Sequence, residues 1–272
     1  MSIRVDCATE EDAHRAIDAA FAAVSRVHAL MSFHEAGSDL SRLHSAPPGE
    51  RVIVDAQTAY VLGEALALAE MTDGAFDVTV AAELVAWGLL PAPSGEAMPS
   101  VGACWKDIAL DEGCGVRLRR PLWIDLGGIA KGYAVDRAID ALQSHDVQHA
   151  CVNAGGDLRT LGDGPHFVAI ASDEVEPSHR AVLEIGEASV ATSSGRAFQA
   201  TGTGPHVNGK RRTGMGLTAS VTVVAAHCMH ADALTKVVMA MGERSVDILG
   251  QFNAVAHVQD ATGHWTQVGT SV

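Results

Sequence analysis

The order of helical and strand-like patterns is the feature that most constrains the fold of this chain. A strand-like run at 3–6 leads into apolar residues at helical spacing over 10–31, and Thr9 before three acidic residues predicts the start of that helix. Strand-like runs at 107–110 and 116–118 are joined by a Gly-containing hairpin signal. Helices and strands therefore do not alternate regularly. This order predicts an α+β fold with largely antiparallel sheets and packed helices rather than a doubly wound parallel sheet.

The remaining patterns continue this mixture of elements. Further helical patterns cover residues 56–71, 129–144 and 229–241. Further strand-like runs lie at 122–126, 149–153, 166–171, 181–185, 189–192, 220–226 and 253–258. We expect the polar segment 32–51 to be a loop with room for a helical turn. We interpret the Pro- and Gly-rich stretch 90–102 as a surface insertion rather than a domain boundary.

The composition excludes several classes of protein. Of the 272 residues, 47% are hydrophobic, which is enough for a core and excludes a disordered chain or a disulfide scaffold. Nineteen basic residues against 33 acidic ones give a formal net charge of −14. This charge opposes binding to nucleic-acid phosphates or to an anionic membrane. An anionic ligand of this chain therefore needs a locally positive or metal-loaded pocket.

Neither the cysteines nor the histidines indicate a zinc site. The five cysteines are dispersed without a C-x-x-C pair, which also disfavours a disulfide framework and favours a reducing compartment. Among thirteen histidines there is no H-E-x-x-H pattern, and the spacing of His227 and His230 is only a weak signal. The nucleophile motif G-x-S-x-G is also missing from the sequence.

The first residues, MSIRVDCATEEDAH, show neither a basic start nor an apolar stretch. They therefore do not resemble a signal peptide, and we expect no membrane-spanning segment in this chain. For the chain as written we expect a cytoplasmic protein, and a periplasmic one if a leader has been trimmed.

The segment 123–137 is the most informative part of the sequence. An apolar run ends in Asp125, Gly127 and Gly128 predict a tight turn, and Lys131 lies in the opening of a helix. Glycines allow a ligand to approach the backbone, and a helix N-terminus offers free N–H groups to an anion. The segment lacks the P-loop and dinucleotide-binding fingerprints. On composition alone, a structural turn and a phosphate site are therefore about equally good interpretations.

Two further acidic turns share this character. The run 153–157 (Asn-Ala-Gly-Gly-Asp) follows a strand-like segment, and its simplest interpretation is a β-turn in which Asp157 bonds its own backbone. In the run 73–77 (Asp-Gly-Ala-Phe-Asp), Asp77 could accept hydrogen bonds from a base or a sugar. Alternatively, its Asp-Gly pair ends one helix and Asp77 caps the next, at 78–87. Two glycine turns that follow strands modestly favour a shared site.

Asp232 lies one turn into the last of these predicted helices. Thr235 and Lys236 share its face, because residues three and four apart are neighbours on a helix. The surrounding residues are apolar, so this patch is not a broad solvated face. A carboxylate beside a hydroxyl suits Mg²⁺, which takes few protein oxygens and completes its shell with phosphates and water. The alternative is an Asp–Lys helix pair with a structural role only.

In order and spacing, these segments resemble the ApbE family, the FAD:protein FMN transferases. The resemblance covers about residues 30–242 and rests on the ordered set of motifs rather than on any single one. Its landmarks are the segments 31–34, 38–43, 73–80, 125–136, 152–157, 191–193, 220–225 and 231–235. It implies one ApbE-like domain over residues 1–272.

The resemblance also implies an activity and its partners. A member of this family is a Mg²⁺-dependent enzyme that cleaves the pyrophosphate of FAD. It transfers FMN to a threonine or serine hydroxyl of a partner flavoprotein and releases AMP. Phosphoryl transfer of this kind depends mainly on positioning and charge neutralisation. A cation would also explain how an acidic chain binds a pyrophosphate.

The resemblance assigns roles to individual residues. Asp125 and Lys131 would contact FAD, while the Gly128 carbonyl, Asp232 and Thr235 would hold Mg²⁺. His206 would be the general base for the acceptor hydroxyl, with Asp232 as the second catalytic residue. The residues that would complete the nucleotide pocket are His34, Ala75, Phe76, Asp77 and Asn208.

The sequence departs from the family pattern at several places. His34 stands where the family usually has tyrosine, and the stretch 206–214 lacks the Asp-Pro of the family motif H-x-x-D-P-x-T-G. Lys236 stands four residues after Asp232, where the family commonly places a metal-binding threonine. Thr235 could substitute for that threonine, or the Lys236 ammonium could supply charge in place of part of the metal shell. The alternative function is FAD binding without transfer, or hydrolysis of FAD to FMN and AMP.

Overall fold

The computed structural model describes residues 1–93, 95, 97–170, 181–194, 206–215, 220–260 and 262–270. Its α-helices are α1 Glu10–Met31, α2 Asp39–Ser45, α3 Ala56–Met71, α4 Ala81–Ala86, α5 Ala130–Gln143, α6 Cys228–Met241 and α7 Val246–Gln251. Among the described residues, 3-10 turns lie at Trp105–Asp107 and Gly242–Ser245. The strands that form the large sheet are β1 Ser2–Asp6, β5 His149–Asn153, β6 Leu158–Leu161, β9 Ser189–Ser194, β12 Ser220–Ala225, β13 Val255–Gln259 and β14 Trp265–Val268. The strands of the smaller sheets are β2 Arg51–Ile53, β3 Ile108–Asp111, β4 Gly115–Leu118, β7 His166–Ala169, β8 Val182–Ile185, β10 Val207–Asn208 and β11 Thr213–Gly214.

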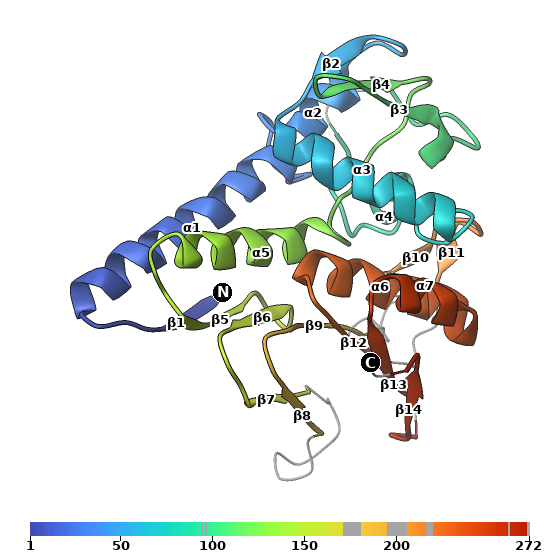
Figure 1. Cartoon of the computed structure of the whole chain (residues 1–272). Coiled ribbons are helices and arrows are strands. Elements are labelled where there is room, and N and C mark those ends of the chain that lie inside the picture. Colours follow the sequence, from blue (N-terminus) through green and yellow to red (C-terminus); the bar gives the residue numbers. More distant parts are fainter. Residues whose placement is uncertain are drawn as a thin grey trace.

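The large sheet is antiparallel throughout and has the order β1-β5-β6-β9-β12-β13-β14. The register sets Val223 of β12 opposite Ala191 of β9 and Ala256 of β13, and all three side chains are buried. Helices α1, α5 and α6 lie in a layer over this sheet, while the small sheet β2-β4-β3 lies beside α2 and α3 (Figure 1). The α+β class with largely antiparallel sheets and packed helices is confirmed.

Several expected boundaries match the structure closely. Helix α1 begins after Thr9, whose side-chain oxygen accepts the N–H of Asp12 at 3.1 Å, and it ends at Met31. Short elements were missed, namely β2, β6, β10, β11, α7 and β14, because two to six residues carry too little periodicity. The loop expected at 32–51 contains the two-turn helix α2, which begins where Ser38 accepts the N–H of Ser41 at 3.1 Å.

The strand expected at 122–126 is wrong. The segment is buried, with Leu122, Ile124 and Leu126 at most 2% exposed, but it has no strand partner among the described residues. Its backbone groups bind elsewhere: the N–H of Ile124 donates to His44 Nε2 at 2.8 Å, and that of Asp125 donates to the Val78 carbonyl at 2.8 Å. A buried apolar run imitates a central strand because sequence cannot show which groups satisfy its backbone.

Helices α5 and α6 approach closely at Gly132. A Cβ atom at this position would lie 2.2 Å from the carbonyl oxygen of Cys228, so only glycine fits without moving a helix. The Asp136 carboxylate accepts the N–H groups of Cys228 and Met229, both at 2.9 Å, and so caps α6, whose own N-cap side chain makes no such bond. Arg159 pairs with the same carboxylate at 2.7 Å. This contact fixes where α6 begins relative to α5.

The stretch 90–102 contains no helix or strand among its described residues, and Met98 and Val101 are strongly exposed. Its interpretation as a surface insertion, and that of residues 1–272 as one domain, stay predictions. Of the helices that the structure describes, none combines the length and the apolar character needed to cross a membrane.

Replacing Gly132 by alanine is expected to destabilise the protein by about 3 kcal/mol, because the new methyl group overlaps the backbone of α6. Gly63→Ala, within helix α3, is the matched control. A Cβ atom at Gly63 would meet only a methyl group of Leu110, at 3.6 Å. That variant should gain about 0.5–1 kcal/mol from helix propensity. Urea unfolding measures both, and equal stability of the two variants would contradict the close packing at Gly132.

His44 is expected to make stability depend on pH. Burial lowers its pKa from 6.5 to about 4. At pH values between these two pKa values, His44 is protonated in the unfolded chain and neutral in the folded protein. Stability is therefore full above pH 6.5 and falls by about 3 kcal/mol as the pH approaches 4.

Urea unfolding of the wild type and of His44→Gln between pH 7.5 and 4.5 measures this contribution. Glutamine keeps an acceptor for the Ile124 N–H but does not titrate, so its stability should fall less steeply. The exposed His14→Gln is the control and should behave like the wild type. Parallel pH curves for wild type and His44→Gln would contradict this account.

Candidate active site

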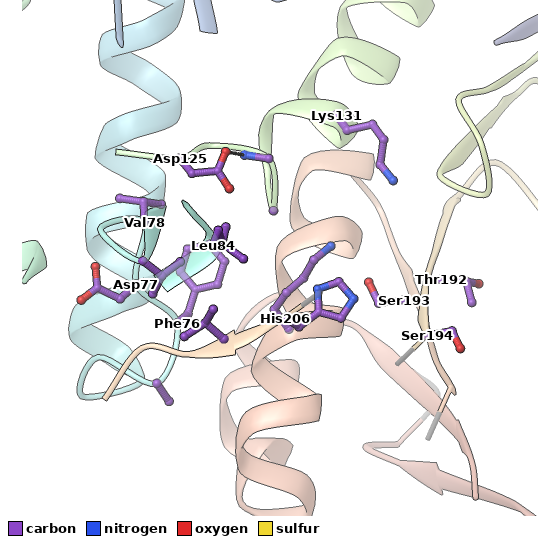
Figure 2. Close-up of a pocket in the computed structure, with 16 residues that line it drawn as sticks. Phe76, Asp77, Val78, Leu84, Asp125, Lys131, Thr192, Ser193, Ser194 and His206 are labelled. Atoms are coloured by element: carbon purple, nitrogen blue, oxygen red, sulfur yellow. Dashed lines mark hydrogen bonds between the residues drawn. The ribbon is translucent and has the colours of Figure 1, made fainter. Parts of the chain in front are cut away.

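A cavity of about 310 Å³ lies between the helical layer and strand β9. Its walls come from the turn 75–80 and Leu84, the turn at 125–131, β9, the residues 206–207 and Lys236 of α6. In the view of Figure 2, Asp125 and Lys131 lie above His206, and the side chain of Ser193 lies beside the imidazole. Segments far apart in the sequence thus bring acidic, basic and hydroxyl groups to one cavity.

A second cavity of about 690 Å³ adjoins the first and shares Asp125, Gly127 and Lys131 with it. Its walls are more apolar and come mainly from helix α1, the turn 31–34 and the first turns of α5. His34 lines this second cavity, whereas Ala75, Phe76 and Asp77 line the first. The Gly-Gly turn at 127–128 and the start of α5 therefore lie where the two cavities meet.

Asp125 is held by its own turn. Its carboxylate accepts the N–H of Gly127 at 2.9 Å, and its side chain faces both cavities. Desolvation raises the pKa of Asp125, and the nearby negative charge of Asp232 adds to this effect. The bond from Gly127 and the positive charge of Lys236 act in the opposite direction. A carboxyl group so placed is suited to bind hydrogen-bond donors of a ligand.

Lys131 lies in the first turn of α5, where the N-terminus of the helix already favours an anion. Its ammonium pairs with Asp157 at 2.8 Å, and this carboxyl is 1% exposed. Burial alone would lower the pKa of Lys131, but the carboxylates of Asp157 and Asp232 raise it, so the group stays positive. The turn 153–157 thus belongs to the site rather than bonding only its own backbone.

Asp232 lies behind the cavity rather than in its wall. It is fully buried, and its Oδ2 accepts the N–H of Gly132 at 3.1 Å. Its Oδ1 pairs with the ammonium of Lys236, which itself lines the cavity. Thr235 is fully buried and bonds the Asp232 carbonyl and Ser193 Oγ, both at 2.7 Å. Within the described ranges, no group of three or more His, Cys, Asp or Glu side chains is arranged to hold a metal ion.

His206 precedes the two-residue strand β10, and its backbone carbonyl accepts the N–H of Met215 at 2.8 Å. Burial lowers the pKa of His206 to about 3, and the Lys236 ammonium contributes to the shift. The imidazole is therefore neutral at physiological pH and able to accept a proton.

Arg212, which the sequence analysis did not single out, binds the segment 73–80 that forms one wall of the cavity. Arg212 donates to Asp77 Oδ2 at 2.9 Å, to the Thr79 carbonyl at 2.8 Å and to the Ala103 carbonyl at 3.0 Å. Asp77 also accepts the N–H of Thr79 at 2.8 Å, so it does not cap α4, whose N-cap is Val80. Burial raises the pKa of Asp77. The basic run 210–212 is the only sequence signal for this clamp.

Most of the predicted site residues meet at this place. Those that line the first cavity are Ala75, Phe76, Asp77, Asp125, Gly128, Lys131 and His206. Asn208 is buried beside it and instead binds the backbone N–H of Arg211 at 3.0 Å. Together, the fold and the two joined cavities define an α+β protein in which Lys131, Lys236 and the start of α5 border one cavity.

The sequence is similar to those of known proteins. Residues 1–258 match the sequence model of the ApbE family. The FAD:protein FMN transferase of Vibrio cholerae is 31% identical over 257 residues, which cover 85% of this chain and 75% of the relative. The FAD:protein FMN transferase of Haemophilus influenzae is 28% identical over 265 residues, with coverage of 87% and 74%. The chain therefore belongs to the ApbE family, and this membership places it among transferase enzymes.

Solved structures share the fold. The ApbE protein from Thermotoga maritima superposes with a TM-score of 0.84 at 26% identity, covering 98% of this chain and 93% of that one. The flavin transferase ApbE from Vibrio cholerae superposes with a TM-score of 0.78 at 25% identity, covering 97% and 91%.

Arg212→Met is expected to lower stability by about 3 kcal/mol, because it leaves the buried Asp77 carboxylate without its cationic partner. Arg211→Met is the matched control, since this neighbouring side chain is exposed. Urea unfolding at pH 7 measures both. An equal loss of stability in the two variants would show that Arg212 does not stabilise this wall of the cavity.

Proposed function

We propose that this chain transfers the FMN part of FAD to a threonine or serine hydroxyl of a partner flavoprotein and releases AMP. One observation carries the proposal, namely the two cavities that share Asp125, Gly127 and Lys131. FAD has two ring systems joined by a pyrophosphate, so a two-part cavity with a lysine and a helix N-terminus at its junction matches its shape and charge. The names of the related transferases support the same reaction.

The reaction is a phosphoryl transfer without a change of oxidation state. The acceptor oxygen attacks the phosphorus of the FMN half, and a new O–P bond forms. The bond from this phosphorus to the bridging oxygen breaks, and AMP leaves with the electron pair. The proton of the acceptor hydroxyl passes to a base. Positioning and neutralisation of the phosphate charge supply most of the catalysis in such reactions.

Several side chains of the site have roles in this proposal. Lys131 and the N–H groups at the start of α5 bind phosphate oxygens, and Asp125 accepts hydrogen bonds from the nucleotide. His206 takes the proton of the acceptor hydroxyl as general base. A bound pyrophosphate would stabilise the imidazolium and raise the low pKa of His206, which makes the proton transfer easier. His34 and the turn 75–77 enclose the ring systems.

The dependence on Mg²⁺ is the part of the family expectation that the donor set does not fit. Both carboxylate oxygens of Asp232 already bind groups of the protein, and one of these groups is the ammonium of Lys236. The Thr235 hydroxyl faces Ser193 and the Asp232 carbonyl. Of the three residues expected to hold Mg²⁺, only Gly128 lines the cavity. We therefore assign no step of the reaction to a metal.

The test is to incubate the protein with FAD and a purified acceptor flavoprotein, and to follow AMP and the covalent flavin fluorescence of the acceptor. AMP and a fluorescent acceptor are expected together. AMP without an acceptor would indicate an FAD hydrolase, and bound FAD without AMP would contradict the enzymatic proposal.

His206→Asn is expected to slow AMP release at least about 100-fold, because general base catalysis contributes about that much or more. FAD binding, measured by quenching of flavin fluorescence, should change little. His14→Asn, at an exposed position on α1, is the control and should keep full activity. An unchanged rate for His206→Asn would remove His206 from the reaction.

A further inference from the structure

Lys236 separates the buried carboxylate of Asp232 from the cavity. Asp232 is 0% exposed and does not line the cavity, whereas the side chain of Lys236 does and is 14% exposed. The lysine stem passes close to Gly128, where a Cβ atom would lie 3.7 Å from Lys236 Cε. A cation that approached Asp232 from the cavity would therefore meet the ammonium first.

The ammonium is bound in a way that leaves a donor for a ligand. An ammonium has three N–H donors. In the described part of the chain, two of them reach Asp232, one at Oδ1 and one at the carbonyl oxygen at 3.1 Å. No acceptor for the third is found among the described residues, and the lysine side chain lines the cavity. A phosphate oxygen there would receive a charge-assisted hydrogen bond.

A divalent cation at this place would conflict with that arrangement. To bind Asp232 it would have to displace the ammonium from Oδ1, and the displaced charge would stay on the same helix turn as the metal. Like charges a few ångströms apart repel strongly in a partly buried site. Mg²⁺ also loses its water reluctantly and prefers sites that offer free oxygen ligands. The buried Asp232 charge, in contrast, already has its partner in Lys236.

We propose that the tethered ammonium of Lys236, held by Asp232, takes the place of a divalent cation at this site and binds the pyrophosphate of FAD directly. The inference rests on the proposed function and specifies how its site neutralises the ligand. FAD then binds, and AMP is released, without a metal ion. Lys131 of α5 and Lys236 of α6 bind the pyrophosphate from two sides, each fixed by its own buried aspartate.

The first experiment uses the unmodified protein. FAD affinity, and AMP release in the presence of the purified acceptor flavoprotein, are measured in excess EDTA and in millimolar MgCl₂, and each should differ by less than twofold between the two conditions. Binding of Mn²⁺ to the flavin-free protein is followed by EPR, and no tight binding is expected. FAD binding only with Mg²⁺, or tight Mn²⁺ binding, would overturn the inference and leave the proposed function standing. Absence of FAD binding in every condition would overturn both.

The second experiment exchanges the ammonium for a hydroxyl. Lys236→Thr should weaken FAD binding at least 10-fold in EDTA, and Mg²⁺ should restore most of that loss. The same variant should acquire Mn²⁺ binding by EPR, a signal that a merely structural lysine would not control. Lys236→Met, which keeps the stem without the charge, should lose FAD affinity with or without Mg²⁺.

Lys106→Thr is the control, because this exposed lysine lies over Trp105 and lines neither cavity. Its FAD affinity should equal that of the wild type in both conditions. Thermal unfolding verifies that each variant is folded. FAD binding by folded Lys236→Met at the wild-type level in EDTA would overturn the inference.

Discussion

The contact between α5 and α6 at Gly132 determines much of this structure. Because residue 132 has no side chain, its N–H can reach the buried carboxylate of Asp232, and Asp136 one turn later can cap the start of α6. Backbone groups that would otherwise be unsatisfied in the core thus bind carboxylates of the facing helix. The contact fixes the two helices relative to each other, and with them the lysines at residues 131 and 236.

This geometry shows how an acidic chain would bind the anionic ligand that we propose for it. The net charge of −14 belongs to the whole chain, whereas the cavity is bordered by two ammonium groups and a helix N-terminus. Each ammonium is positioned by a carboxylate with almost no exposure to water, Asp157 for Lys131 and Asp232 for Lys236. Part of the acidity of the sequence therefore serves to orient positive charge. We propose that the lysines of the two helices supply the positive charge that the family resemblance assigns to a metal ion.

The sequence was sufficient for the elements that contain a long periodic pattern or a strong cap. Helix α1, with its Thr9 cap, falls in this group, and the turns next to Asp125 and Asp157 were located from their Gly-Gly pairs. It was insufficient at 122–126, where a buried extended segment binds a histidine side chain instead of a strand. It also missed the clamp of Arg212 on Asp77, because residues 135 positions apart meet only in the folded chain. The motifs predicted which segments line the cavity, but not which side chains pair with one another.

The central claim is that FAD lies across the two cavities with its pyrophosphate between Lys131 and Lys236. The most direct test is a crystal structure of the protein soaked with FAD and MnCl₂, with an anomalous difference map recorded for manganese. The account predicts pyrophosphate oxygens within hydrogen-bond distance of both ammonium groups and no manganese peak at Asp232. A manganese ion on Asp232 with Lys236 displaced, or FAD bound outside the two cavities, would contradict it.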